Sequence, residues 1–230
     1  MTFAVFFYKS YNKPRTMDYE DMHAFGSPII KIKKGLILMK ENDIKKSVAD
    51  FYKDIASDKK KVRVKTKELG KALGYTQEEL DSVPEEANMG LGCGNPQEKA
   101  EPKPGETILD LGCGKGMDVF IAAKKVGASG HVIGVDMTLE MVQKARMIAE
   151  KRKFTNVEFR LGEIEFLPIG DNSIDLVLSN CVINLATDKS IVYREILRVL
   201  KKGGRIGISD ITLSEHLPQE VLDDPRMYGT

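Results

Sequence analysis

Residues 107–116 read TILDLGCGKG, and this stretch indicates the fold of the 230-residue chain. Its first half, Thr107 to Leu111, is a short apolar run typical of a buried strand. The glycines that follow allow a tight turn and a close approach of the backbone to a ligand before a helix begins at Met117. The segment therefore predicts a strand, a glycine-rich turn and a helix in succession.

The rest of the C-terminal half repeats this alternation. Strands are predicted at residues 107–111, 131–135, 157–160, 174–178 and 205–209, and helices at residues 117–126, 138–152 and 189–200. Gly203 and Gly204 are expected to stop the last helix, which ends at Leu200. Such a rhythm predicts an α/β fold in which crossover helices join the strands of a parallel sheet.

The first 100 residues are organised differently. Residues 1–38 show neither a sustained helical nor a strand period and are interpreted as an irregular N-terminal extension. From Met39 the pattern is helical, with apolar positions 44, 48, 51, 52 and 55 on one face. A capping box of Thr76 and Glu79 opens a short helix, and residues 88–96, NMGLGCGNP, contain enough glycine to predict a loop. Residues 39–100 thus form a predicted helical segment with this loop, and residues 101–230 the main domain.

Composition and charge narrow the classes of function. With 42% hydrophobic and 30% charged residues, the chain fits a globular enzyme. A net charge of +1 creates no field that would steer it to nucleic acid or to an acidic membrane, and no apolar run approaches the roughly 20 residues that span a bilayer. We expect a cytoplasmic protein with no nucleic-acid or membrane partner. The three widely separated cysteines are expected to be free thiols rather than a disulfide framework.

A cofactor cleft is predicted where the strands end, because parallel sheets bind ligands outside the carboxyl ends of their strands. Informative residues should therefore follow Leu111, Val135, Arg160, Leu178 and Ser209. The glycine spacing G-x-G-x-G differs from that of dinucleotide-binding and phosphate-binding loops. Asp110 suits a ligand with an ammonium or sulfonium charge, or alternatively caps the loop. Asp136 can accept hydrogen bonds from both hydroxyls of a ribose, or alternatively supplies charge to a helix N-terminus.

Residues 108–116 together with Val135 and Asp136 resemble the class I S-adenosylmethionine-dependent methyltransferases. The resemblance implies a Rossmann-like sheet with parallel strand order 3-2-1-4-5, flanked by helices and preceded by a helical extension. It also implies that the cofactor is S-adenosylmethionine, with Asp136 at the ribose and Met137 beside the adenine. The cofactor-binding residues implied in this way are Asp110, Gly112, Gly114, Gly116, Asp136, Met137, Glu163, Ile164 and Asn180.

Two cysteines are predicted to face the methyl donor. Cys181 lies in residues 179–185, SNCVINL, directly after the fourth predicted strand, and Cys93 lies in the glycine-rich loop of residues 88–96. Two thiolates suggest a soft, thiophilic substrate rather than zinc, which prefers four closed ligands. Alternatively, each cysteine is a small buried apolar residue. Cys113, within the glycine turn, is interpreted as structural.

The loop sequence and the SNCVINL sequence, taken with residues 134–138 and 160–165, resemble the arsenite S-adenosylmethionine methyltransferases over about residues 41 to 228. The resemblance implies that Cys93 and Cys181 are catalytic and hold trivalent arsenic, whose lone pair attacks the sulfonium methyl group, and that the role is detoxification. The substrate is then arsenite or its thiol conjugate, and a thiol reductant such as glutathione or thioredoxin is a partner. The motif shared by methylases of exocyclic base amines is absent, which disfavours nucleic acid as the substrate.

The chain departs from that family at its end. Members carry a further cysteine after the segment that matches residues 217–228, whereas this sequence stops at Thr230. Either the chain is a truncated form, or a partner or a small thiol completes the site. We expect cofactor binding to persist, whereas methylation, especially of already methylated arsenic, is expected to be weak or absent. Two other hypotheses stay open, namely a methyltransferase for another small molecule and a non-catalytic module that binds S-adenosylmethionine or arsenic. The oligomeric state cannot be predicted.

Overall fold

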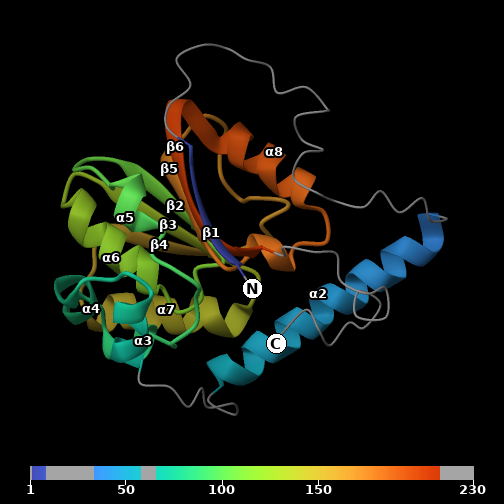
Figure 1. Ribbon diagram of the computed structural model, residues 1–230, viewed down its shortest axis with the longest axis horizontal. Coiled ribbons are helices and arrows are strands. Elements are labelled where there is room, and N and C mark those ends of the chain that lie inside the picture. The colour runs from blue at the N-terminus through green and yellow to red at the C-terminus, as the bar shows by residue number, and fades with distance from the viewer. Residues whose placement is uncertain (1, 9–33, 58–65, 213–230) are drawn as a thin grey trace.

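The computed structural model describes residues 2–8, 34–57 and 66–212 (Figure 1). Side chains are described for residues 42–57 and 66–211. The predictions for residues 9–33, and for the segment near the end of the sequence that was compared with arsenite methyltransferases, lie outside the described residues.

The described residues form one six-stranded sheet with helices on both faces (Figure 1). The strands are β1 (Thr2–Tyr8), β2 (Thr107–Leu111), β3 (His131–Asp136), β4 (Val157–Leu161), β5 (Ile174–Asn180) and β6 (Leu200–Thr212). The helices are α2 (Lys34–Ala56), α3 (Thr66–Ala72), α4 (Gln77–Ser82), α5 (Gln97–Ala100), α6 (Met117–Val126), α7 (Leu139–Lys151) and α8 (Lys189–Val199), with 3₁₀ turns η1 (Glu85–Ala87) and η2 (Ile183–Leu185).

The order of the strands across the sheet is β1-β6-β5-β2-β3-β4. Strands β2 to β6 run parallel to one another. Counted along the chain, these five strands have the order 3-2-1-4-5, so the predicted topology is confirmed. Each crossover carries the chain back across one face of the sheet, as a parallel arrangement requires.

The N-terminal strand β1 was not predicted. Residues 2–8 pair antiparallel with β6, from Thr2 opposite Thr212 to Tyr8 opposite Ile206 (Figure 1). The sequence here, TFAVFFY, is a continuous run of aromatic and apolar residues. It lacks the alternation that identifies a half-buried strand, although aromatic and β-branched residues favour strands in general. The interpretation of residues 1–38 as irregular is therefore wrong for residues 2–8, and wrong again for residues 34–38, which begin α2.

The core lies in two layers because successive strand residues point to opposite faces of the sheet. In β2, Ile108 packs with α6 and α7 on one face, whereas Leu109 packs with α8 on the other. Figure 1 shows α6 and α8 on opposite sides of the strands. The apolar stripe predicted for α7 is buried as expected, at Met141, Val142, Ala145, Ile148 and Ala149.

The end of α8 differs from the prediction. The helix ends at Val199 because Leu200 already has an extended backbone and starts β6. Gly203 and Gly204 therefore do not stop the helix. They lie inside β6 between Leu200, which pairs with Ile174, and Arg205, which pairs with Leu176, where the register of the two strands shifts. Glycine is common at such irregularities of a strand.

Helix α2 begins at Lys34 and packs along α7. Its residues Val48 and Ile55 are buried, and Ile55 clusters with Met141 of α7. The predicted capping box of α4 is confirmed, since the Glu79 amide donates to Thr76 Oγ1 and the Thr76 amide donates to the Glu79 carboxylate. Among the described helices, none has the length and apolar character needed to cross a membrane.

Candidate active site

A pocket opens where β2, β3 and β5 end, as the parallel topology predicts. Its lining includes residues from the glycine turn, the loop of residues 88–96, the turn after β5 and helix α2. The predicted site residues that line it are Asp110, Gly112, Gly114, Asp136, Met137, Ile164, Asn180 and Cys181. Three others, Gly116, Glu163 and Cys93, lie beside the pocket without lining it.

The Asp136 carboxylate is fixed by the backbone at the end of β3. The Gly114 amide donates to Oδ2 at 2.9 Å and the Thr138 amide donates to Oδ1 at 2.8 Å. Burial raises the pKa of this carboxyl, and these hydrogen bonds partly counter the rise. The Thr138 side chain also hydrogen-bonds to the carboxylate. Because a carboxylate offers about four acceptor sites, Asp136 can still accept a hydrogen bond from a ribose hydroxyl.

The Asp110 carboxyl lies at the end of β2 and is 2% exposed. Burial, together with the carboxylates of Asp118 and Asp136, raises the pKa of Asp110 well above its usual value. A cationic ligand would lower the pKa of Asp110 again, because a nearby positive charge stabilises the ionised carboxylate. The site therefore fits a ligand with an ammonium or sulfonium group, such as S-adenosylmethionine.

The glycines of the turn have different roles. Gly114 has a φ of 53°, and a Cβ there would lie 2.6 Å from Cε of Met89 in the loop of residues 88–96. Gly116 has a φ of 93° and precedes the first residue of α6. A Cβ at Gly116 would lie 2.8 Å from the Phe159 ring, so this glycine permits close packing against Phe159.

Helix α2 contributes to the pocket, which the sequence did not reveal. Its residues Lys45, Val48 and Tyr52 are part of the lining. The Lys45 ammonium pairs with Glu163 at 2.5 Å and with Glu165 at 3.2 Å. The Glu163 side chain is thus held by α2. The helix closes the side of the pocket on which the adenine contacts were predicted.

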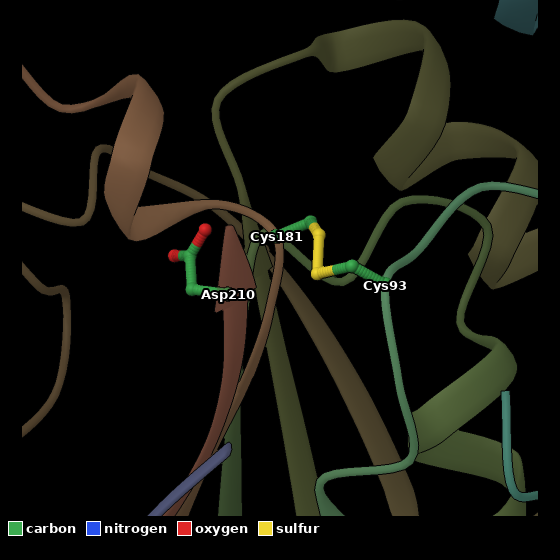
Figure 2. A group of neighbouring side chains, drawn as sticks. All are labelled: Cys93, Cys181 and Asp210. Atoms are coloured by element: carbon green, nitrogen blue, oxygen red, sulfur yellow. A yellow bond between two sulfur atoms is a disulfide. The ribbon is translucent and has the colours of Figure 1, made fainter. Parts of the chain in front are cut away.

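Cys93 and Cys181 form a disulfide, with their Cα atoms 6.0 Å apart (Figure 2). The expectation of free thiols is therefore wrong for these two residues, which are separated by 88 positions in the sequence. The pairing arises because the loop of residues 88–96 folds back onto the carboxyl end of β5, within normal disulfide range. Cys113 is free and buried, as predicted.

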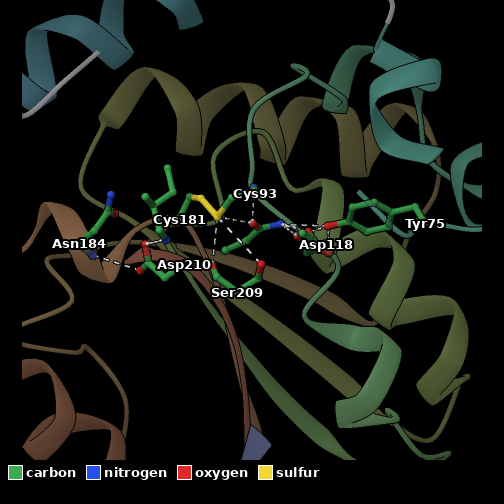
Figure 3. Close-up of a disulfide and its surroundings, with 10 residues drawn as sticks. Tyr75, Cys93, Asp118, Cys181, Asn184, Ser209 and Asp210 are labelled. Carbon is green, nitrogen blue, oxygen red and sulfur yellow. Dashed lines mark hydrogen bonds between the residues drawn. A yellow bond between two sulfur atoms is a disulfide. The ribbon is translucent and has the colours of Figure 1, made fainter. Parts of the chain in front are cut away.

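Asn180 holds that loop in place. Its Oδ1 accepts a hydrogen bond from the Cys93 amide at 3.1 Å, and its Nδ2 donates to the Gly94 carbonyl at 2.9 Å. The same Nδ2 also contacts Tyr75 and Asp118, whose side chains hydrogen-bond to each other (Figure 3). Asn180 lines the pocket where a cofactor contact was predicted, but its polar atoms are engaged with the protein.

Cys181 has a left-handed backbone, with a φ of 55°. Its amide donates to the Ser209 carbonyl at 2.8 Å, which ties this conformation to the end of β6. Non-glycine residues rarely adopt this region, and such strain is concentrated at functional sites. Here the conformation places the Cys181 side chain both against Cys93 and along the pocket.

Asp210 is a third polar group beside the two cysteines. One of its carboxylate oxygens and the two sulfur atoms all lie within 4.8 Å of one another (Figure 2). The carboxylate accepts hydrogen bonds from the amides of Asn184 and Ile211, and burial raises its pKa. Asp210 was not among the predicted site residues, although it directly follows Ser209, one of the predicted strand ends.

Comparison with known proteins agrees with this geometry. Residues 102–230 match the protein-family profile described as a methyltransferase domain. The chain belongs to this methyltransferase family. The predicted class of enzyme and the predicted cofactor, S-adenosylmethionine, are thereby confirmed for the family.

Arsenite methyltransferases are among the relatives of this methyltransferase chain. The protein from Halobacterium salinarum is 49% identical over 153 residues, which are 66% of this chain and 39% of that protein. The human protein is 42% identical over 123 residues, which are 50% of this chain and 33% of that one. The chain therefore matches well under half the length of these relatives.

A solved structure shares the fold. CrArsM, an arsenic (III) S-adenosylmethionine methyltransferase from Chlamydomonas reinhardtii, is 38% identical, with a TM-score of 0.55. The match covers 68% of this chain and 53% of that one.

Proposed function

We propose that this chain transfers a methyl group from S-adenosylmethionine to trivalent arsenic bound by Cys93 and Cys181. The observation that carries the proposal is the convergence of these two cysteines on one edge of the methyl-donor pocket, since Cys181 lines the pocket and is bonded to Cys93. The arsenite methyltransferases among its relatives support the same substrate.

Different residues would bind the cofactor and the arsenic. Asp136 would hold the ribose hydroxyls of the cofactor and Asp110 its cationic end, for the reasons of charge and hydrogen bonding given above. When bound, S-adenosylmethionine would supply an electrophilic methyl group, which a lone pair on arsenic can take without a general base. Cys93 and Cys181 would keep the arsenic beside that group, and such positioning of two reactants contributes several kcal/mol to rate acceleration.

Reduction must precede capture of arsenic. A disulfide offers no thiolate, so a thiol reductant such as glutathione or thioredoxin would first convert Cys93 and Cys181 to thiols. Thiolates are soft donors and favour a soft, thiophilic acceptor. We therefore include a reductant of this class in the proposed reaction.

The test is transfer of labelled methyl from S-adenosylmethionine to arsenite in excess glutathione. Cys93→Ser and Cys181→Ser are each expected to abolish transfer, because a single remaining thiol cannot chelate arsenic. Arsenic capture by the reduced protein, measured by mass spectrometry, should be lost in both variants. Cys113→Ala is the matched control and should retain capture, since the Cys113 thiol packs against Gly134 and not against the pair.

Two results would contradict the proposal. Full transfer by either serine variant would show that the cysteines are incidental, as expected of a methyltransferase for another small molecule. Binding of both S-adenosylmethionine and arsenite without any transfer would instead favour a non-catalytic binding module.

A further inference from the structure

Three donor atoms from three separate elements meet at the edge of the pocket. They are Sγ of Cys93 in the loop of residues 88–96, Sγ of Cys181 after β5 and a carboxylate oxygen of Asp210 in β6, all within 4.8 Å of one another. Figure 2 shows the Asp210 carboxylate beside the disulfide, at the end of its strand. The carboxylate is an oxygen donor next to a pair of sulfur donors, so the group is not a pure thiolate site.

When arsenite binds to two thiols, one of its three hydroxyl groups remains on the arsenic atom. Arsenite, As(OH)₃, has three As–O bonds. Two thiols form two As–S bonds, two As–O bonds break, and the two hydroxyl groups leave as water with the thiol protons. No electrons are transferred once a phosphine or thiol has reduced the disulfide. The product carries a single As–OH, which is a hydrogen-bond donor.

Asp210 has the capacity to accept from that hydroxyl. Its Oδ2 accepts a hydrogen bond from the Asn184 amide at 3.1 Å and its Oδ1 accepts one from the Ile211 amide at 2.8 Å, and the Ile183 amide also donates to this carboxylate. A carboxylate offers about four acceptor sites, so capacity for a further donor remains. The amides also fix the orientation of the carboxylate, and Figure 3 shows it beside the residues around the disulfide.

We propose that Asp210 determines specificity for inorganic arsenite by accepting a hydrogen bond from the As–OH that remains after Cys93 and Cys181 have bound. The inference rests on the proposed function, because it requires arsenic at this pair of thiols. An organic arsenical such as methylarsonous acid, CH₃As(OH)₂, loses both hydroxyls to the thiols and presents a methyl group instead. When methylarsonous acid is bound, the Asp210 carboxylate is partly desolvated and receives no hydrogen bond from the ligand. The missing hydrogen bond lowers the affinity for methylarsonous acid relative to arsenite.

The experiment measures the affinity of the reduced 230-residue chain for arsenite and for methylarsonous acid by calorimetry. A phosphine is the reductant because it brings no competing thiol. Asp210→Ala is expected to weaken arsenite binding about tenfold or more, the effect of losing a hydrogen bond to a charged group, without weakening binding of methylarsonous acid. Asp210→Asn should show a smaller loss, because a neutral amide oxygen accepts a weaker hydrogen bond than a carboxylate.

The ratio of the affinity for arsenite to the affinity for methylarsonous acid distinguishes loss of the Asp210 hydrogen bond from general damage to the site. Loss of the bonds to Asn184 and Ile211 would affect both ligands alike. Asp188→Ala is the matched control, since Asp188 also accepts from two backbone amides but caps α8, and it should leave both affinities unchanged. An unchanged affinity ratio in Asp210→Ala would overturn the inference and leave the proposed function standing. Failure of the reduced wild-type chain to bind either arsenical would overturn both.

Discussion

Replacing Asn180 with alanine is expected to loosen the loop that carries Cys93. The Asn180 side chain joins the end of β5 to two backbone groups of that loop, the Cys93 amide and the Gly94 carbonyl. Both groups would lose their partner in the variant. The sulfur of Cys93 would then spend less time beside the sulfur of Cys181, so their effective concentration would fall.

The magnitude follows from the two hydrogen bonds. Each one, at 3.1 Å and 2.9 Å, has normal geometry and contributes a net free energy of about 1 kcal/mol. Together they contribute about 2 kcal/mol to docking of the loop, which corresponds to roughly a 30-fold change in an equilibrium constant. The effective concentration of the two thiols is therefore expected to fall roughly 30-fold in Asn180→Ala.

The assay is equilibration of the protein in glutathione buffers of known composition. Free thiols are trapped by alkylation and the oxidised fraction is read by mass spectrometry. The expected shift is toward reduced protein, because formation of the disulfide depends on the proximity of its thiols. An equilibrium within twofold of wild type would refute the argument that Asn180 docks the loop.

Ser179→Ala is the matched control for this experiment. Ser179 precedes Asn180 in β5 and is fully buried, and among the described residues its hydroxyl has no hydrogen-bond partner. Removing that oxygen should leave the thiol equilibrium unchanged. A shift as large as that of Asn180→Ala would show that any change in this part of β5 disturbs the loop.

Three further outcomes are expected. Cys181→Gly should have a free energy of unfolding about 1 kcal/mol higher than Cys181→Ser in chemical denaturation, because only glycine adopts a left-handed φ without strain. The affinity for S-adenosylmethionine, measured by calorimetry, should fall as the pH is lowered through the raised pKa of Asp110, since protonation removes the charge that attracts the cation. Asp110→Asn should flatten that dependence. Arg205→Met should lower the free energy of unfolding by roughly 1–3 kcal/mol at neutral pH, because it removes the paired charge from the part-buried Glu106. Burial raises the pKa of Glu106, but the hydrogen bonds and charge of Arg205 outweigh burial, so the pKa is lowered overall. The difference in unfolding free energy between wild type and Arg205→Met should therefore disappear as the pH falls through the lowered pKa of Glu106.

The parallel part of the fold could be predicted because its signals are local. The strand, turn and helix of residues 107–126 have the predicted bounds, since apolar runs and glycines act over a few residues. Strand β1 could not be predicted in the same way. It is stabilised by pairing with β6, about 200 residues later, and its continuous apolar pattern has no period that distinguishes a strand from other buried segments.

The candidate site was predictable to the extent that it follows strand ends. Asp110, Asp136 and Cys181 were found by this rule, and all three line the pocket. The same rule could have identified Asp210, which follows Ser209. By contrast, the contribution of Lys45 depends on how α2 packs across the pocket, and side-chain packing between distant segments leaves no short-range pattern in the sequence.

The disulfide between Cys93 and Cys181 could not be predicted from residue type alone. The resemblance to the arsenite methyltransferases implied that the two cysteines lie close together, but it did not indicate that they form a disulfide. Asn180 links the loop to the end of β5 through hydrogen bonds that reach Cys93 and Gly94 across 86 or more positions. These bonds involve no sulfur atom, so they remain available when the disulfide is reduced. The reduced thiols are therefore expected to stay close together, and a dithiol arranged in advance binds a chelated atom with less loss of conformational entropy than a flexible one.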